Sequence, residues 1–134
     1  MKILTVDDAP DMLLMIRAII QKLGHDVDTA NDGLEAWDML CKRDYDVVVS
    51  DWNMPFMDGL ALVKKIREAN FDHYTYIILC TGNDEEGDLV KAIDGGADDY
   101  VSKYSGTDQL RVRLQSAQRI IDLERRLLKQ TTTA

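Results

Sequence analysis

Five short apolar segments alternate with longer segments of helical periodicity along this 134-residue chain. The apolar segments have the length and the β-branched and aromatic composition of strands, and they cover residues 3–6, 27–30, 47–50, 76–80 and 100–102. Between the first two, Leu13, Ile16 and Ile20 follow helical spacing, with Pro10 suited to a first helical turn and Gly24 to a C-terminal cap. The pattern therefore predicts five β-α units.

Such regular alternation indicates a parallel sheet with helices on both faces, because right-handed crossovers place each helix against the sheet. The run Val47-Val48-Val49 is apolar without alternation, which is typical of a strand buried on both sides. We expect an α/β, doubly wound, flavodoxin-like (βα)5 three-layer sandwich with a parallel five-stranded sheet of order 2-1-3-4-5. The fourth helix, expected over residues 84–93, contains Gly87, which costs about 1 kcal/mol relative to alanine.

The segment after residue 107 contains no glycine or proline, so it predicts an extended C-terminal helix. Two interpretations stay open for this helix. It is either a solvated extension of the domain or a dimerising or signalling helix that leads to an output module outside this chain. The residues with the 4-3 spacing of a coiled-coil seam are Leu114, Ala117, Ile121, Glu124 and Leu128.

Length and charge limit the organisation and the partners. We expect one domain over residues 1–121 and a helical extension or linker over residues 122–134. Residues 1–107 hold 21 acidic and 10 basic residues, a net charge of −11, whereas residues 108–134 hold 3 acidic and 6 basic residues, a net charge of +3. Because so acidic a body repels phosphate backbones, we expect no direct nucleic-acid binding. Phosphate chemistry on this chain would need a cation.

No apolar run approaches the roughly 20 residues of a membrane span, and two aspartates follow Val6 before a signal-peptide core could form. We therefore expect a cytoplasmic protein that does not enter a membrane. Cys41 and Cys80 lack both the CxxC spacing and the neighbouring histidines of a zinc site. Buried apolar thiols are expected at both positions.

Polar side chains follow four of the expected strands, at the edge where open α/β sheets bind ligands. Asp7 and Asp8 come after the first strand, Asp51 after the third, Thr81 after the fourth and Lys103 after the fifth. Three carboxylates held close together raise each other's pKa unless a cation shares the site. Mg²⁺ fits this role because it prefers oxygen ligands. We expect Asp8 and Asp51 to bind it directly and Asp7 to act through water.

A carboxylate can attack phosphorus to form an aspartyl-phosphate while a metal and a lysine absorb the charge of the transferring group. Asp51 is the best placed nucleophile because it ends the most buried strand. Lys103 and the Thr81 hydroxyl would hold two phosphoryl oxygens, and Gly82 would let backbone amides approach the third. Alone, each residue is more simply a cap, a turn residue or a surface charge. Their joint placement at strand ends is what points to function.

Together these motifs resemble the receiver domain of two-component response regulators, and the resemblance covers residues 2 to about 121. Its elements are the acidic pair in Val6-Asp7-Asp8, the segment Ser50-Asp51-Trp52-Asn53-Met54-Pro55, the turn Met57-Asp58-Gly59, the pair Thr81-Gly82, and Gly96-Ala97-Asp98-Asp99-Tyr100 leading to Lys103.

The resemblance implies that Asp51 accepts a phosphoryl group from the phosphohistidine of a sensor histidine kinase or phosphotransfer protein. Mg²⁺ would be bound by Asp8, Asp51 and the Asn53 carbonyl, with Asp7 assisting through water. No enzymatic activity is implied beyond self-phosphorylation and autodephosphorylation. The same resemblance implies that Thr81 moves toward the phosphoryl group.

Tyr100 would turn inward as the switch aromatic, and the face formed by the fourth helix, fifth strand and fifth helix would control an output domain or effector protein. A homodimer through that face or through the C-terminal helix is a further option. The pattern over residues 117–126 also resembles helices that join receivers to diguanylate cyclase or similar outputs. The chain is then either a stand-alone receiver or an excised one.

One position departs from the family pattern. Tyr104 follows Lys103, where the family usually has proline and a cis peptide bond. Because a cis bond before another residue costs about 2.5–4 kcal/mol, a trans bond here would displace the loop and alter the switch. We still expect Lys103 to reach the site.

Three alternatives remain. One is an adaptor receiver that acts without phosphorylation. A haloacid-dehalogenase-like phosphatase needs a second aspartate where Asn53 stands, because an amide cannot protonate a leaving group. A flavodoxin-type FMN carrier would offer hydroxyls and amides to a phosphate in its first loop, whereas Asp7-Asp8-Ala9-Pro10 repels one.

Overall fold

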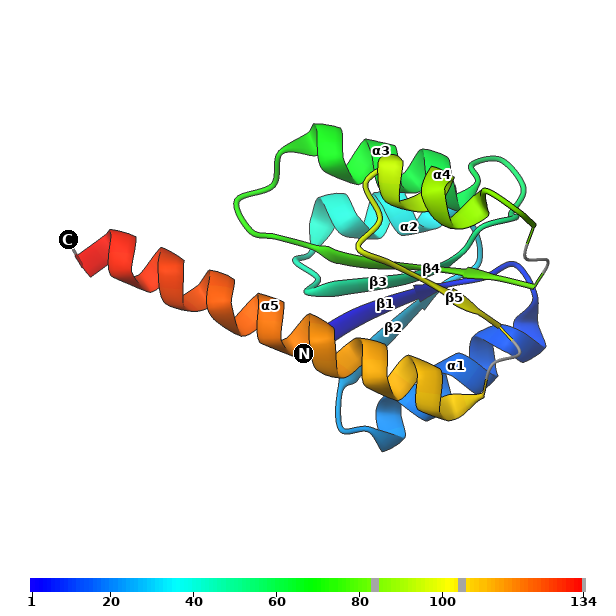
Figure 1. Ribbon diagram of the computed structural model, residues 1–134, viewed down its shortest axis with the longest axis horizontal. Coiled ribbons are helices and arrows are strands. Elements are labelled where there is room, and N and C mark those ends of the chain that lie inside the picture. Colours follow the sequence, from blue (N-terminus) through cyan, green and yellow to red (C-terminus); the bar gives the residue numbers. More distant parts are fainter. Residues whose placement is uncertain (83–84, 104–105, 134) are drawn as a thin grey trace.

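A computed structural model describes residues 1–82, 85–103 and 106–133. Strands and helices alternate strictly along these residues, as the sequence predicts (Figure 1). The elements are β1 (Lys2–Val6), α1 (Pro10–Lys22), β2 (Asp26–Ala30), α2 (Gly33–Lys42), β3 (Val47–Asp51), α3 (Gly59–Ala69), β4 (Tyr76–Thr81), α4 (Asp88–Asp94), β5 (Asp99–Ser102) and α5 (Thr107–Thr133).

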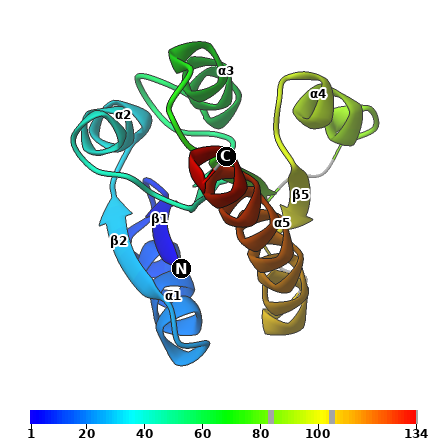
Figure 2. The same cartoon turned by 90° about the vertical axis from the view of Figure 1, so that its left-hand side faces the viewer.

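The five strands form one parallel sheet of order β2-β1-β3-β4-β5, which confirms the predicted topology. Helices α2, α3 and α4 cover one face of the sheet and α1 and α5 the other, so the molecule has three layers (Figures 1 and 2). Because all strands point the same way, their carboxyl ends meet at one edge. The register places Asp51 opposite Cys80 and Thr81 opposite Ser102 at that edge.

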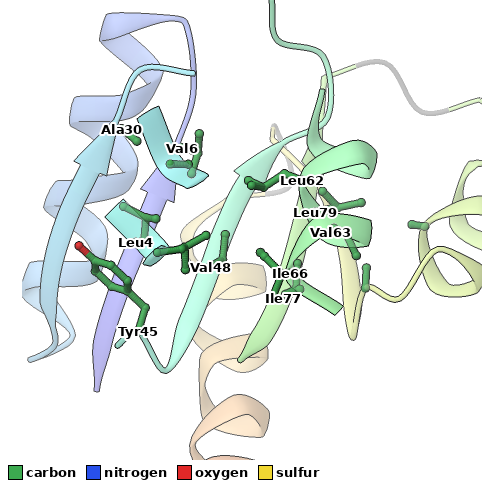
Figure 3. Packing of buried hydrophobic residues seen from close by; sticks show 14 residues of the cluster. Leu4, Val6, Ala30, Tyr45, Val48, Leu62, Val63, Ile66, Ile77 and Leu79 are labelled. Atoms are coloured by element: carbon green, nitrogen blue, oxygen red, sulfur yellow. The ribbon is translucent and has the colours of Figure 1, made fainter. Parts of the chain in front are cut away.

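Alternate residues of each central strand fill two separate cores. Leu4 and Val48 pack with the helices of the α2-α3-α4 face (Figure 3), whereas Ile3 and Val47 pack with α1 and α5. Every residue of β3 is buried, as predicted for a strand covered on both faces. The functional edge is therefore built on β3 and β4, whose residues are all buried.

Carboxylates begin two of the helices that cover this sheet. The Asp32 side chain accepts a hydrogen bond from the Glu35 amide at the start of α2, at 2.8 Å, and Asp58 does the same for Ala61 in α3. These caps satisfy amides that have no partner within the helix. They also fix where each loop at the carboxyl edge of the sheet ends.

The prediction for the fourth helix is wrong at its start. Residues 85–87 are not helical, α4 begins only at Asp88, and residue 84 lies outside the described residues. Gly87 has φ +88°, a left-handed conformation that interrupts a helix and that glycine adopts without strain. The Asp88 carboxylate accepts a hydrogen bond from the Glu85 amide at 3.0 Å, which holds the turn before the helix.

Most residues of the 4-3 spacing in the C-terminal segment lie on the side of α5 that packs against the sheet. Leu110, Leu114, Ala117 and Ile121 are buried in the core that α5 shares with β4 and β5. This part of the seam packs against its own domain. Beyond it, α5 continues past the body of the protein (Figure 1), and the boundary expected at residue 121 stays a prediction. None of the described helices is long and apolar enough to cross a bilayer.

The two cysteines differ, and the prediction for Cys41 is wrong. Cys80 is buried in the core beneath α1 and α5, as expected, but Cys41 is exposed on α2. Burial, and then the charge of Asp51, raises the pKa of the Cys80 thiol to about 12. Only Cys41 is therefore available to a thiol reagent.

We predict that native protein treated with N-ethylmaleimide takes up one adduct per chain, and that Cys41→Ser takes up none. Cys80 does not react because it is both inaccessible and protonated. Intact-mass measurement counts the adducts, and unfolding in guanidinium serves as the control in which wild type takes two. Rapid double labelling of native protein would contradict this assignment.

Candidate functional site

The polar residues predicted from the strand ends lie together at the carboxyl edge of the sheet. Asp7, Asp51 and Thr81 are 1%, 5% and 2% exposed, while Asp8 points to solvent. One carboxylate oxygen from each of the three aspartates lies within 4.8 Å of the others. The fold therefore brings together the acidic cluster that the sequence predicts.

Lys103 reaches both buried carboxylates. Its Nζ lies 3.0 Å from Oδ2 of Asp7 and 3.0 Å from Oδ2 of Asp51. The sequence predicts that Lys103 enters the site, but not that one ammonium bridges these two aspartates. The Lys103 ammonium partly offsets the repulsion between the buried carboxylates of Asp7 and Asp51.

The charges in the site shift its pKa values. Burial raises the pKa of Asp51, and the Asp7 charge adds to this, while the hydrogen bond from Lys103 and the Asn53 backbone amide act in the opposite direction. Burial alone would lower the pKa of Lys103, but the hydrogen bonds that it donates to Asp7 and Asp51, together with their negative charges, outweigh burial and raise that pKa. Lys103 therefore stays cationic at neutral pH.

The donor set fits a hard divalent cation. Asp7 Oδ1 accepts a hydrogen bond from the Ala9 amide at 2.9 Å, whereas its buried Oδ2 has only the Lys103 ammonium as a partner among the described residues. Asp8 and Asp51 add further carboxylate oxygens. Oxygen-only donors with incomplete hydrogen bonding suit Mg²⁺.

The backbone around Asp51 is held by short contacts. The Trp52 amide donates to the Cys80 carbonyl at 2.9 Å, and the Gly59 amide donates to the Trp52 carbonyl at 2.7 Å. A Cβ at Gly59 would collide with the Asp51 carbonyl oxygen and lie 2.9 Å from Leu79 Cδ2. Glycine therefore lets α3 begin directly against the loop that follows Asp51, which gives the Met57-Asp58-Gly59 turn a physical reason.

Two aromatic rings and two additional carboxylates lie beside the site. Trp52 and Tyr100 contact edge to face, with ring centroids 5.9 Å apart. A polar pocket is lined by Trp52, Asn53, Thr81, Glu85 and Asp88. Sequence reasoning did not include Glu85 and Asp88, because they lie in the segment expected to be helical.

The other predicted site residues have mixed outcomes. Asn53 and Gly82 are exposed next to the acidic cluster, and the metal and phosphoryl contacts expected of them stay predictions. Lys103 reaches the cluster as expected, and its amide donates to the Thr81 carbonyl at 2.8 Å. Tyr104 lies outside the described residues, so the effect of the missing proline also stays a prediction.

Comparisons with known proteins agree with this geometry. The family model of the response regulator receiver domain matches residues 3–115. A chemotaxis protein CheY homolog of Campylobacter jejuni is 38% identical over 117 residues, which cover 86% of this chain and 90% of that protein. A Francisella response regulator receiver domain has a TM-score of 0.80 at 32% identity, covering 87% of this chain and 94% of that one. The Thermotoga maritima response regulator TrrA, solved in complex with Mg²⁺ and BeF, has a TM-score of 0.77 at 32% identity, covering 87% and 97%.

The chain therefore belongs to the family of response regulator receiver domains, as the residue pattern indicates. It is a CheY-like receiver whose aspartate cluster fits a phosphoacceptor site.

We predict that Asp51→Asn unfolds at a higher temperature than wild type at neutral pH and low Mg²⁺. Because folding raises the pKa of Asp51, stability falls as the pH rises from the ordinary aspartate pKa through the raised one, and the full cost of the ionised form is present above it. An amide removes this cost, and each kcal/mol relieved raises the melting temperature by about 3–5 °C in a domain of this size.

Thermal unfolding followed by circular dichroism over a series of pH values measures the difference in melting temperature between Asp51→Asn and wild type. The advantage of the variant should shrink as the pH falls through the raised pKa, because wild-type Asp51 then becomes protonated. Asp38→Asn, at an exposed position on α2, is the matched control and should show no such advantage. A variant less stable than wild type at pH 7 would contradict the prediction.

Proposed function

We propose that Asp51 is the phosphoacceptor and that this receiver takes its phosphoryl group from a phosphohistidine on a sensor histidine kinase or phosphotransfer protein. The observation that carries the proposal is the Lys103 ammonium, which lies 3.0 Å from both Asp51 and Asp7 inside a cluster of three carboxylates. Asp51 ends β3 at the carboxyl edge of the sheet, which is where a partner can reach it. Family membership and the BeF complex of TrrA support the same assignment.

In the proposed transfer, an Asp51 carboxylate oxygen attacks phosphorus, and an O–P bond forms as the N–P bond to the donor histidine breaks. The electron pair of the broken bond returns to the imidazole, which takes up a proton. Lys103 balances charge on the phosphoryl oxygens, and the Thr81 hydroxyl donates a hydrogen bond to them. The attacking group is the ionised carboxylate, and the Lys103 ammonium 3.0 Å away favours that form of Asp51.

The residues that would hold Mg²⁺ are Asp8, Asp51 and the Asn53 carbonyl, with Asp7 acting through water. When bound, the ion supplies positive charge that lets the carboxylates and the phosphoryl oxygens share one site. Asp7 is buried and its Oδ1 is fixed by the Ala9 amide, so its Oδ2 stays within the cluster beside the Lys103 ammonium. The exposed Asp8 completes the cluster from the solvent side.

The output is proposed to follow from Thr81 and Tyr100. Thr81 lines a polar pocket with Trp52 and Asn53, and Tyr100 contacts Trp52, which supports a role for both residues in the response to a phosphoryl group. Movement of these residues would alter the α4-β5-α5 face for an output domain or effector protein, or for a second copy of the chain. Apart from phosphorylating and dephosphorylating itself, the domain would have no enzymatic activity.

Phosphorylation is tested by intact mass after incubation with acetyl phosphate and Mg²⁺. We predict one phosphoryl adduct on wild type, none when Mg²⁺ is chelated, and none on Asp51→Asn. Asp38→Asn is the control that should be labelled like wild type. Lys103→Met should lose at least tenfold in labelling rate, because the transferring group loses its cation.

An unlabelled wild-type protein under these conditions would overturn the proposal and favour the adaptor that acts without phosphorylation. Continuous turnover of acetyl phosphate or another phosphate ester without an accumulated adduct would favour the phosphatase. Labelling that persists in Asp51→Asn would move the acceptor to another residue.

Metal binding has a separate readout in Trp52, which directly follows Asp51. We predict that Mg²⁺ changes Trp52 fluorescence in a saturable way and stabilises wild type by about 2.7 kcal/mol when the free ion reaches 100 times its Kd. Asp8→Asn should weaken the binding, because it removes a carboxylate oxygen from the proposed ligands. Trp37→Phe removes the other tryptophan signal as a control. An unchanged spectrum and melting temperature would contradict the metal assignment.

A further inference from the structure

Helix α5 makes polar contacts with the opposite, amino-terminal edge of the sheet. The Glu124 carboxylate accepts a hydrogen bond from the Tyr74 amide, just before β4. Arg125 Nη2 lies 2.8 Å from Oδ1 of Asp46, just before β3. We call these two contacts, Glu124 to Tyr74 and Arg125 to Asp46, the α5 clasp.

The partners of the clasp are anchored in the sheet. The second oxygen of Asp46 accepts a hydrogen bond from the Lys2 amide at 2.9 Å, and the Asp46 carbonyl accepts one from the Tyr76 amide at 2.9 Å. Asp46 is therefore tied to β1 and β4 as well as to α5. One turn before the clasp, Ile121 is 1% exposed, so the helix reaches it already packed against the domain.

Tyr74 also belongs to a network that includes the start of β5. Its hydroxyl donates to Asp98, and Arg67 Nη2 donates to the other oxygen of Asp98 at 2.7 Å. Arg67 in addition donates to the Thr75 carbonyl at 2.7 Å, and Asp98 accepts a hydrogen bond from the Ile77 amide at 2.8 Å. A change in the position of Asp98 therefore reaches Tyr74 through fixed hydrogen bonds rather than through a flexible loop.

Asp98 directly precedes β5, and β5 leads into the phosphoacceptor site. Tyr100, two residues along, contacts Trp52 edge to face, and Lys103 follows the strand and pairs with Asp51. The contacts thus form a continuous route from Asp51 along β5 to Asp98, then through Tyr74 to α5. Such a route can carry coupling between two sites if both bias the same element.

We propose that the α5 clasp is thermodynamically coupled to the phosphoacceptor site, so that occupation of the site by a phosphoryl group weakens the clasp and frees the end of α5. This inference rests on the proposed function of Asp51. The clasp coexists with the arrangement in which Lys103 pairs with Asp7 and Asp51. A phosphoryl group draws the Lys103 ammonium to its own oxygens and so acts against that arrangement at the end of β5.

Coupling is reciprocal, so breaking the clasp must strengthen binding at the site by the same factor. The probe is Mg²⁺ with beryllofluoride, the pair named in the TrrA structure, and the readout is its Kd from Trp52 fluorescence. We expect Glu124→Ala and Arg125→Ala to lower this Kd at least threefold. Arg126→Ala, at an exposed neighbouring position, is the matched control and should leave the Kd unchanged.

Glu124→Gln distinguishes loss of the hydrogen bond to Tyr74 from any other effect of changing residue 124. The glutamine oxygen still accepts a hydrogen bond from the Tyr74 amide, so this variant should bind the probe as wild type does. Tyr74→Phe keeps the amide but removes the hydroxyl that donates to Asp98, and it should behave like the clasp variants. General destabilisation would weaken probe binding rather than strengthen it.

Amide hydrogen exchange of residues 122–130 gives a second readout. Mg²⁺ with beryllofluoride should accelerate exchange there in wild type and have little effect in Glu124→Ala. Probe binding with an unchanged Kd in every clasp variant and unchanged exchange would overturn this inference and leave the proposed function standing. Failure of wild type to bind the probe or to take a phosphoryl group would overturn the proposed function, and the inference with it.

Discussion

One ammonium shared between two buried carboxylates is the interaction on which the site depends. Asp7 and Asp51 are almost fully enclosed, and two ionised acids in such a place repel each other while losing hydration. Lys103 offsets part of this cost, yet the pKa of Asp51 remains raised. The site is therefore left with excess negative charge that a divalent cation can relieve. An acceptor for phosphoryl groups needs the same property, because the incoming group adds more negative charge.

The sheet topology explains why a lysine fills this position. β1 and β3 are neighbours, so Asp7 and Asp51 meet directly, but β5 lies two strands away from β3 across β4. Two strand spacings are about 10 Å, and the lysine side chain, extended from the loop after β5, spans much of that gap. A shorter side chain at the end of β5 would not reach both carboxylates. The strand order 2-1-3-4-5 and the identity of Lys103 thus depend on each other.

Periodicity in the sequence predicts the strands, the helices and a parallel sheet whose carboxyl edge holds the site, because these follow from local apolar spacing and β-α alternation. The sheet order comes with the flavodoxin-like fold class instead. The helical spacing also indicates that Cys41 is exposed, which the interpretation of this cysteine overlooked. Leu40 lies on the buried side of α2, and Cys41, the next residue, is turned about 100° away from it. The bridging position of Lys103 and the contact between Glu124 and Tyr74 join residues far apart in the chain. Polar contacts of this kind depend on tertiary geometry and produce no repeating pattern in the sequence.

Helix α5 shows how one spacing pattern can serve a different purpose from the one it suggests. Its 4-3 seam faces the sheet through Ile121, and Glu124 continues that side by binding the Tyr74 amide, so a partner helix cannot use these residues while the clasp is closed. Leu123 and Leu127 instead lie on another side of the helix, 51% and 63% exposed. A homodimer through α5 would have to pack along this second stripe. Because both sides belong to the same end of α5, release of the clasp would also change how that stripe is presented.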